Sequence, residues 1–240
     1  MITLARILLY PIKSLNGTSV DRATLLLSGS LEHDRRYAVI DMDGNVVNGK
    51  RTAKVHRLRC KLEFTSGMVS LGTADASQVQ SFQIDDQRRE VNDWFSRFFE
   101  MSVQLAEDGS RGFPDDTDAP GPTIASIASL AEVARWFSDL TVDECRGRFR
   151  ANLEFEGTEP FWEDHLFSEA GSPVRFSIGS VVIEGARPCQ RCVVPSRSAQ
   201  TGETTPGFQR TFAERRKKNL GSRVAPPRFD HYYRFAVNTR

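Results

Sequence analysis

Cysteine is scarce in this chain of 240 residues. Cys60, Cys145, Cys189 and Cys192 are too few and too widely spread for the disulfide framework that holds small secreted domains together. The sequence therefore predicts a protein of a reducing compartment, and we expect it in the cytoplasm. A chain of this length can bury a sizeable core without such cross-links.

Long apolar runs are absent as well. No stretch reaches the roughly 18 consecutive apolar residues of a membrane-spanning helix. The apolar run at the N-terminus is interrupted by Arg6, and no small-residue cleavage site follows it. We therefore expect neither a membrane span nor a secretory signal.

Charge of one sign is not in excess either. The formal net charge is only +1, so no global field attracts nucleic acid or an acidic membrane surface. The strongest basic run, from Arg210 to Lys218, is interrupted by Phe212 and Glu214 and is typical of the solvated face of a short helix. We expect no nucleic-acid partner, and any anion site has to be local.

Strand patterns fill the first part of the chain. Short runs rich in Val, Ile, Leu, Phe and Tyr are separated by Gly, Asn and Asp. The Asp-Gly-Asn at 43–45 lies between two apolar runs and predicts a hairpin turn. The predicted strands cover residues 3–10, 23–27, 36–47 and 61–65.

The rest of the chain combines helices and strands. Aromatic and apolar residues recur at helical spacing over residues 89–101, and the capping box Ser129–Glu132 begins a second helix. The Asp-, Gly- and Pro-rich segment 107–122 predicts a loop between two regions. Further strands are predicted at residues 150–157, 174–180 and 181–188, and an extended segment that needs a partner strand at 232–240.

These patterns predict a mainly β (α+β) fold. We expect an N-terminal β-barrel-like domain at residues 1–106, packed on a second β-rich domain with inserted helices at residues 107–240. The composition, with 39% hydrophobic and 26% charged residues, is that of an ordinary globular protein. No internal repeat or low-complexity tract divides the chain.

The pair Cys189-Gln-Arg-Cys192 is the first stretch that suggests chemistry. Zinc needs further ligands, and neither the isolated histidines nor the other cysteines supply them by spacing. A thioredoxin-like dithiol would precede a helix, which the following Val-Val-Pro disfavours. Two thiols without a role are a third possibility. The fourth is a thiolate that binds a soft metal, with Arg191 favouring the ionised sulfur and the other ligands arriving with a cofactor.

Two stretches in the first half could hold a bulky anion. Lys13 and Ser14 follow the end of a predicted strand, where an ammonium, a hydroxyl and backbone N–H groups can meet a phosphate. Arg35 and Arg36 open a strand with opposite facing, so one of them would point inward only towards an anion or a carboxylate. The alternative in both cases is a set of solvated charges.

Two stretches in the second half are of the same kind. Arg150 and Asn152 fall on one face of a predicted strand and offer a guanidinium fork and an amide, unless they belong to an exposed strand edge. The segment Pro160–Asp164 joins aromatic residues to two carboxylates. It is either a lid over a site or the start of a helix with acids near its positive end.

In their order along the chain, these stretches resemble the MOSC family, the molybdenum cofactor sulfurase C-terminal domain, preceded by that family's N-terminal β-barrel domain. The resemblance runs from Tyr10 to Asn238 and covers nearly the whole chain. The matching pieces are YPIKS, the DR of HDRRYAVID, GNVVNGKR, IASLAE, RFRANL, PFWED and CQRCVVPSRSAQTGE.

The resemblance implies a molybdopterin-type molybdenum cofactor and the reduction of small N-hydroxylated compounds. It implies Cys192 as the molybdenum ligand and catalytic residue. Because no ferredoxin-like cysteine cluster is present, electrons should come from a separate donor protein. The other residues of the family's cofactor site fall on Lys13, Ser14, Arg35, Arg150 and Asn152.

The chain also departs from the family pattern. Ser198–Gln200 stands where many relatives have Asp-Pro, and Lys50-Arg51 stands for a common Arg-Gln pair. We further expect that the family's last strand, which follows Asn-Thr-Arg, is missing. An alternative function is a cofactor carrier or a sulfur carrier with a persulfide on Cys189 or Cys192, and a cofactor-free binding protein is a third.

Overall fold

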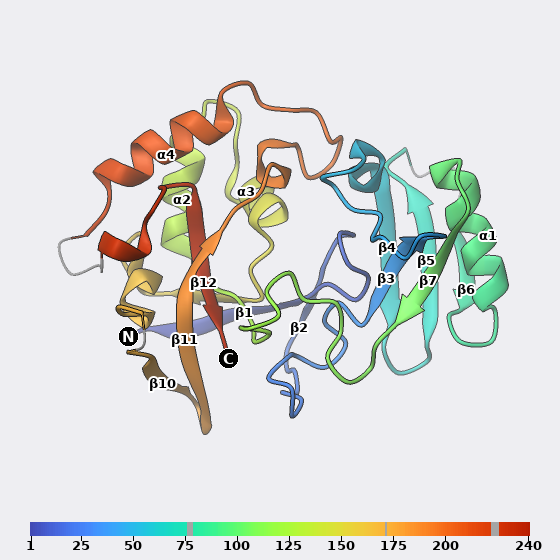
Figure 1. Cartoon of the computed structure of the whole chain (residues 1–240), viewed down its shortest axis with the longest axis horizontal. Coiled ribbons are helices and arrows are strands. Elements are labelled where there is room, and N and C mark those ends of the chain that lie inside the picture. The colour runs from blue at the N-terminus through green and yellow to red at the C-terminus, as the bar shows by residue number, and fades with distance from the viewer. Residues whose placement is uncertain (76–78, 171, 222–225) are drawn as a thin grey trace.

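The chain combines several separate β-sheets with four described α-helices, which confirms the predicted α+β fold class (Figure 1). The computed structural model describes residues 1–75, 79–170, 172–221 and 226–240. The strands are β1 (Thr3–Leu9), β2 (Thr18–Val20), β3 (Tyr37–Asp41), β4 (Leu58–Glu63), β5 (Met68–Thr73), β6 (Gln80–Gln83), β7 (Val103–Glu107), β8 (Ile124–Ser126), β9 (Leu153–Glu156), β10 (Val174–Ile178), β11 (Val181–Gln190) and β12 (Arg234–Thr239). The helices are α1 (Arg88–Phe99), α2 (Ile127–Arg135), α3 (Val142–Phe149) and α4 (Phe208–Lys218), with short 3₁₀ helices η1 (Ala53–Arg57), η2 (Trp162–Leu166), η3 (Val194–Ser196) and η4 (Pro226–Arg228).

The described strands of the second half join one seven-stranded sheet in the order β10-β11-β12-β8-β9-β1-β2. Its strand pairs are antiparallel, except that β8 and β9 are parallel. β1 pairs with β9 from Thr3 opposite Glu156 to Ile7 opposite Leu153. Because β1 and β2 precede residue 106, this sheet takes strands from both predicted domains, and the division at 106/107 stays a prediction.

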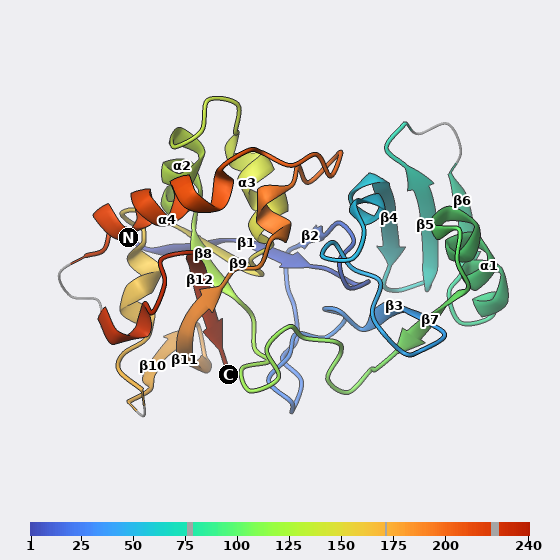
Figure 2. The ribbon, with the colours of Figure 1, turned by 45° about the horizontal axis from the view of Figure 1, so that its top comes forward.

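The extended segment near the C-terminus has its expected partner. β12 pairs with β11 on one side and with β8 on the other, and all six of its residues are buried. Helices α2, α3 and α4 lie over one face of this sheet (Figure 2). Their contact with the sheet is largely aromatic, because Phe149, Phe208, Phe212 and Phe235 form one buried cluster.

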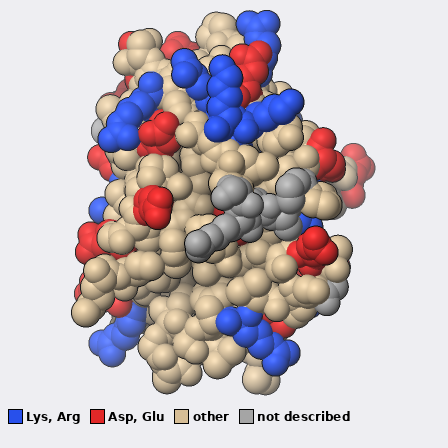
Figure 3. All heavy atoms as spheres, turned by 90° about the vertical axis from the view of Figure 1, so that its left-hand side faces the viewer, with Lys and Arg blue, Asp and Glu red and all other residues tan. Residues whose placement is uncertain are grey.

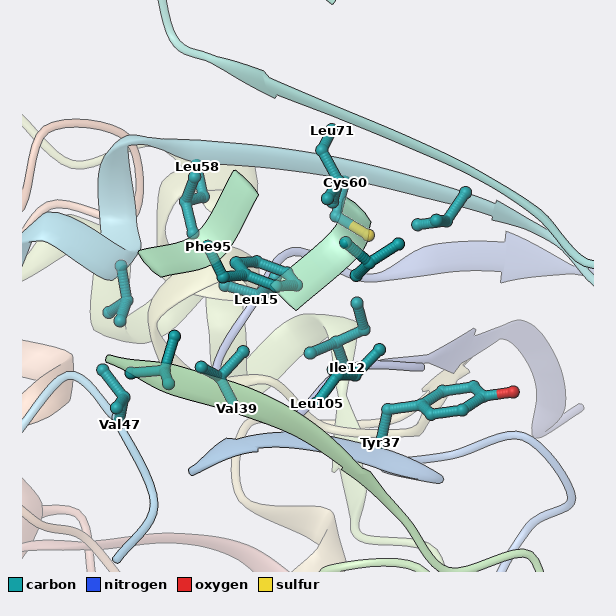
Figure 4. Close-up of a cluster of buried hydrophobic side chains, with 14 of the residues drawn as sticks. Ile12, Leu15, Tyr37, Val39, Val47, Leu58, Cys60, Leu71, Phe95 and Leu105 are labelled. Carbon is teal, nitrogen blue, oxygen red and sulfur yellow. The ribbon is translucent and has the colours of Figure 1, made fainter. Parts of the chain in front are cut away.

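The N-terminal half has a core of its own. Its described strands form a two-stranded sheet, β3-β7, and a three-stranded sheet, β4-β5-β6, and they do not close into a barrel. Side chains of both sheets and of α1 meet between them, as Phe95, Leu71 and Val39 do in Figure 4. The predicted amphipathic helix is confirmed as α1, which buries Val91, Phe95 and Phe99. Ile12 and Leu15 also enter this core and are 0% and 3% exposed.

Several sequence predictions agree with the structure. Residues 43–45 form the predicted turn, in which the Asp41 carboxylate accepts hydrogen bonds from the backbone N–H groups of Asp43 and Asn45. Gly44 takes a left-handed φ of 82° there, a conformation that glycine adopts without strain. The predicted loop follows β7, and none of the described helices is long and apolar enough to cross a bilayer.

Other predictions were wrong in their local structure. Residues 23–27 form only an isolated bridge, between Leu25 and Leu31, and Leu27 is fully exposed. The capping residue of α2 is Ser126, whose hydroxyl accepts from the N–H of Ser129. Ser129 itself lies inside the helix and is buried.

The second half contains a helix, α3, that the sequence patterns did not predict. It ends at Phe149, and Arg150 is its C-terminal cap with a left-handed φ of 57°. β9 therefore begins only at Leu153, so Arg150 and Asn152 do not share a strand face as expected.

The two alternatives for Pro160–Asp164 are also resolved. The segment starts the short helix η2, and Glu163 and Asp164 are buried rather than part of an open lid. Asp164 pairs with Arg216 of α4, which is 1% exposed. The predicted solvated helix at residues 210–218 is confirmed as α4, but Arg216 belongs to its buried face.

Gly185 of β11 is a point at which this packing tolerates no side chain. A Cβ at this position would overlap the carbonyl oxygen of Leu166 in η2. We expect Gly185→Ala to lower the free energy of unfolding by about 3 kcal/mol. Gly179→Ala is the control, since no described residue lies within 4 Å of its Cβ and a left-handed φ of 60° is what opposes the change. Gly179→Ala should lower the free energy of unfolding by about 1 kcal/mol. Urea titration would measure both, and equal losses would contradict this packing.

Candidate functional site

A cavity of about 900 Å³ is lined by residues from both halves of the molecule. Its volume lies in the range of small-molecule and cofactor sites. The residues that sequence reasoning singled out all line it, although they come from four separate segments. They are Lys13, Ser14, Arg35, Arg150, Asn152 and Cys192.

The cavity lining is strongly basic. It includes ten Lys and Arg residues but only four Asp and no Glu, whereas the whole chain has a net charge of only +1. The clustered cations create a local positive field that attracts anions. The nearly neutral charge of the whole chain does not exclude such a local site.

Lys13 and Ser14 owe their position to the two apolar residues that flank them. Ile12 and Leu15 are held in the N-terminal core (Figure 4), and the two polar residues between them line the cavity. The Lys13 ammonium donates to the Phe113 carbonyl at 2.8 Å and lies 2.7 Å from an Asp115 oxygen. Within the described part of the chain, neither the backbone N–H nor the hydroxyl of Ser14 has a hydrogen-bond partner. Both are available to a ligand.

Arg35 and Arg36 point in opposite directions, as predicted. The Arg35 side chain is 13% exposed and pairs with Asp34, and its Nη1 lies 3.4 Å from the Asn152 amide oxygen. Arg36 turns outward and pairs with Glu107. The strand begins later than expected, at Tyr37, and Arg35 precedes it in a turn with φ of 50°.

Arg150 is a cation of the cavity that forms no ion pair among the described residues. Its guanidinium stacks on the Tyr10 ring at 4.1 Å from the centroid, and Nη1 donates to the Leu15 carbonyl. Its Nη2 is enclosed and has no partner among the described residues, and no carboxylate pairs with it. Burial, and then the neighbouring Arg35, lower the pKa of Arg150 to about 10. A buried donor of this kind is costly unless an anion or acceptor meets it.

Asn152 is 1% exposed, and its amide is already engaged. Nδ2 donates to the Leu8 carbonyl at 3.0 Å, and Oδ1 accepts from the backbone and hydroxyl of Thr123 at 3.2 and 3.1 Å. These bonds fasten β1 to the start of β8 and β9. Since Arg35 also contacts Oδ1, Asn152 orients a cation of the cavity while keeping the sheet together.

Three of the predicted residues share an unusual backbone. Ser14, Arg35 and Arg150 have φ values of 72°, 50° and 57°. Side chains other than glycine rarely adopt this left-handed conformation, which costs on the order of 1–3 kcal/mol per residue. Such strain clusters at ligand sites, where it brings polar groups from different segments together.

The two cysteines of the Cys-x-x-Cys pair are half-buried and line the cavity, and neither is in a disulfide. Arg191 is directed at Cys189, to whose sulfur its Nη1 donates at 3.1 Å, while its Nη2 donates to the Phe149 carbonyl at 2.6 Å. Cys60 and Cys145 are buried core residues, and burial raises the pKa of each thiol to about 12.

Sequence reasoning missed three further residues of the site. Tyr10 is buried and lies beneath both Arg35 and Arg150, and burial raises its pKa to about 12. His56 lines the cavity with an unpartnered Nε2, and burial, then Arg150, lower its pKa to about 4. Burial acts to raise the pKa of Asp115, but nearby Lys13 and Arg35 hold it at about 2. The position of Tyr10, directly before Pro-Ile-Lys-Ser, was the one available signal.

The protein alone offers a metal few ligands here. Within the described ranges, no three His, Cys, Asp or Glu side chains come together as a metal-binding group. A soft metal at Cys192 would need its other ligands from a bound molecule. An anionic small molecule that brings sulfur ligands would satisfy both the thiol and the unpaired cations.

Comparison with known proteins agrees with this arrangement. The family model of the MOSC N-terminal beta barrel domain matches residues 1–144, and that of the MOSC domain matches residues 123–237. A protein of Drosophila mojavensis named molybdenum cofactor sulfurase is 23% identical over 238 residues, which cover 88% of this chain. Its namesake in Caenorhabditis briggsae is 23% identical over 257 residues, which cover 95% of this chain.

A shorter relative is the protein of Bos taurus named mitochondrial amidoxime reducing component 2. It is 27% identical over 240 residues, which cover 83% of this chain and 68% of that protein. The match to the two sulfurases covers only 30% and 34% of their lengths, so this chain spans about a third of them.

Two neighbouring arginines test whether Arg150 is held without a counter-charge. We expect Arg150→Met, in protein dialysed free of ligands, to leave the free energy of unfolding unchanged or to raise it by up to about 2 kcal/mol. Arg146→Met is the matched control, because Arg146 pairs at 2.7 Å with Glu154, which is fully buried. That change should cost about 3 kcal/mol. Denaturant titration would measure the free energy of unfolding of both variants. A similar decrease in both would contradict the account of Arg150.

Proposed function

The chain belongs to the MOSC family, and we propose that it is a molybdenum-cofactor-binding oxidoreductase that reduces small N-hydroxylated or related N-oxygenated compounds. The observation that carries the proposal is the basic cavity lined by Cys192, in which Arg150 has no counter-charge among the residues that the structure describes. The name of the bovine relative, an amidoxime reducing component, supports the same class of substrate.

The residues of the cavity fit a molybdopterin-type cofactor. Its phosphate is a bulky anion, and the lining supplies the ammonium of Lys13 and the guanidinium groups of Arg35 and Arg150. The free hydroxyl and N–H of Ser14 add neutral donors. The Nη2 of Arg150, enclosed and unpartnered, is the kind of donor that an anionic ligand would satisfy.

Cys192 is the residue we assign to the metal. Molybdenum bound in this way would supply two-electron oxygen-atom transfer, which the side chains of the chain cannot perform. The thiol of Cys192 would be its one protein ligand. Arg191, held by the Phe149 carbonyl and by the Cys189 sulfur, keeps a fixed positive charge next to that ligand.

The chain's own side chains would bind the cofactor, orient it and neutralise its negative charge. Lys13, Arg35 and Arg150 would offset negative charge, and the left-handed backbone at Arg35 and Arg150 holds these two cations in place before the ligand arrives. Reduction of an N–OH group consumes two electrons and two protons and releases water. A separate donor protein would supply the electrons.

One observation favours a second function. Cys189 is free, half-buried and contacted by a guanidinium, which are properties of a thiol that could accept a sulfane sulfur. A sulfur carrier or cofactor carrier would use the same cavity without turnover. The sulfurase names of several relatives belong with this alternative. We prefer the reductase, because a large cavity ringed by positive charge suits a reacting cofactor.

Serine substitutions of the two cysteines separate these functions. In protein from a host that makes the cofactor, we expect Cys192→Ser to lower the reduction of a simple aromatic N-hydroxyamidine, driven by reduced methyl viologen, by about 100-fold or more. Cys189→Ser should retain activity within about threefold, since it keeps the proposed ligand. Full activity of Cys192→Ser with cofactor bound would disprove the metal assignment, and absence of reduction by the unmodified protein with cofactor bound would favour the carrier.

A further inference from the structure

A group of cations without carboxylate partners lies beside the cavity. Lys50 and Arg57 are exposed, and Arg59 and Arg197 are half-buried. Within the described ranges, none of the four forms an ion pair, although Arg51 and Lys54 next to them do. Arg59 and Arg197 donate only to backbone carbonyls. The group therefore presents uncompensated positive charge to the solvent.

Close contacts make the two segments that carry these cations into one surface. A Cβ at Gly49 would lie 3.1 Å from a methyl group of Val194, and one at Gly202 would lie 2.8 Å from the Ala53 carbonyl oxygen. Arg59 also reaches the Gln200 carbonyl at 3.4 Å. Figures 1 and 2 both show the loop after η3 beside η1. We call this surface, from residues 49–59 and 193–202, the basic rim.

The basic rim adjoins the proposed metal ligand. Lys50, His56 and Val194 line the cavity as well as belonging to the rim. Val193 directly follows Cys192 and is 39% exposed, so an apolar side chain lies among the charges at this point. A small apolar centre within a charged margin is the usual composition of a transient protein contact.

A second basic surface serves as a comparison. α4 exposes Arg210, Arg215, Lys217 and Lys218, and basic side chains gather on the face of the molecule that Figure 3 shows. None of these four residues lines the cavity. This surface has a similar charge but does not adjoin the cavity, which makes it a natural control.

We propose that the basic rim is the docking surface for an acidic electron-transfer protein of the ferredoxin type. The inference rests on the proposed function, in which the donor gives up two electrons for each N–O bond reduced. Docking at the rim brings the donor to the cavity next to Cys192, whereas docking at α4 does not. Transient redox encounters bury little surface, so complementary charge has to supply most of their association rate.

The test uses a plant-type ferredoxin as an acidic probe. Its affinity would be measured at low ionic strength with Arg57→Glu and with Arg57→Glu/Arg59→Gln. The control is Arg215→Glu on α4, which makes the same charge change on an exposed residue that forms no ion pair among the described residues. Binding does not depend on turnover, and viologen-driven reduction of the N-hydroxyamidine would be measured separately on each variant.

We expect Arg57→Glu to weaken ferredoxin binding by about 5- to 10-fold, and Arg215→Glu by less than about twofold. At 0.5 M NaCl the difference between them should vanish, because exposed charges are screened. Viologen-driven activity should be the same in all variants.

Absence of ferredoxin binding, or equal weakening by Arg57→Glu and Arg215→Glu, would overturn the docking surface. Absence of viologen-driven activity in the unmodified protein would instead count against the proposed function, so the two failures are distinguishable.

Discussion

The site depends on one arrangement, in which the guanidinium groups of Arg35 and Arg150 lie over the same Tyr10 ring, at 5.1 and 4.1 Å from its centroid. Like charges held this close are unfavourable, and within the described part of the chain Arg35 pairs with the Asp34 carboxylate while Arg150 has no such partner. The aromatic face and the carbonyls of Leu15 and Ala151 fix the geometry without neutralising Arg150. The chain thus maintains a local excess of positive charge that a bound anion would relieve.

The topology explains why this charge lies where the two halves meet. β1 is paired with β9 in the large sheet, and the chain then passes directly into the N-terminal core through Ile12 and Leu15. The residues between these anchors are shared by both halves. Arg150 and Cys192 reach the same cavity from the end of α3 and from the loop after β11. A site built in this way requires both halves to fold together.

The sequence predicted the composition of the site better than its geometry. Helix α1 follows from periodicity, because it buries one regular face, and β10 follows from its alternating pattern. In contrast, β12 buries all six of its residues. The strand predicted at residues 23–27 had a suitable composition. It does not form because the segment finds no partner strand among the described residues beyond an isolated bridge, and Leu27 is exposed. The helix α3 was missed because Gly147 weakens its signal and the apolar run after it resembles a strand.

Backbone conformation was the least predictable feature of the site. No sequence pattern indicates that Ser14, Arg35 or Arg150 should be left-handed, since residues other than glycine avoid that region. Strand periodicity placed Arg150 and Asn152 side by side for the wrong reason, and tertiary structure brings them to one cavity by another route.

The most direct test of the central claim is the molybdenum and pterin content of the protein. It should be isolated from a host able to make the cofactor and examined by elemental analysis and by the fluorescence of the oxidised pterin. The account predicts close to one molybdenum and one pterin per chain, as expected for a cavity whose cations require an anion. Protein that remains free of both, despite cofactor supply, would contradict it.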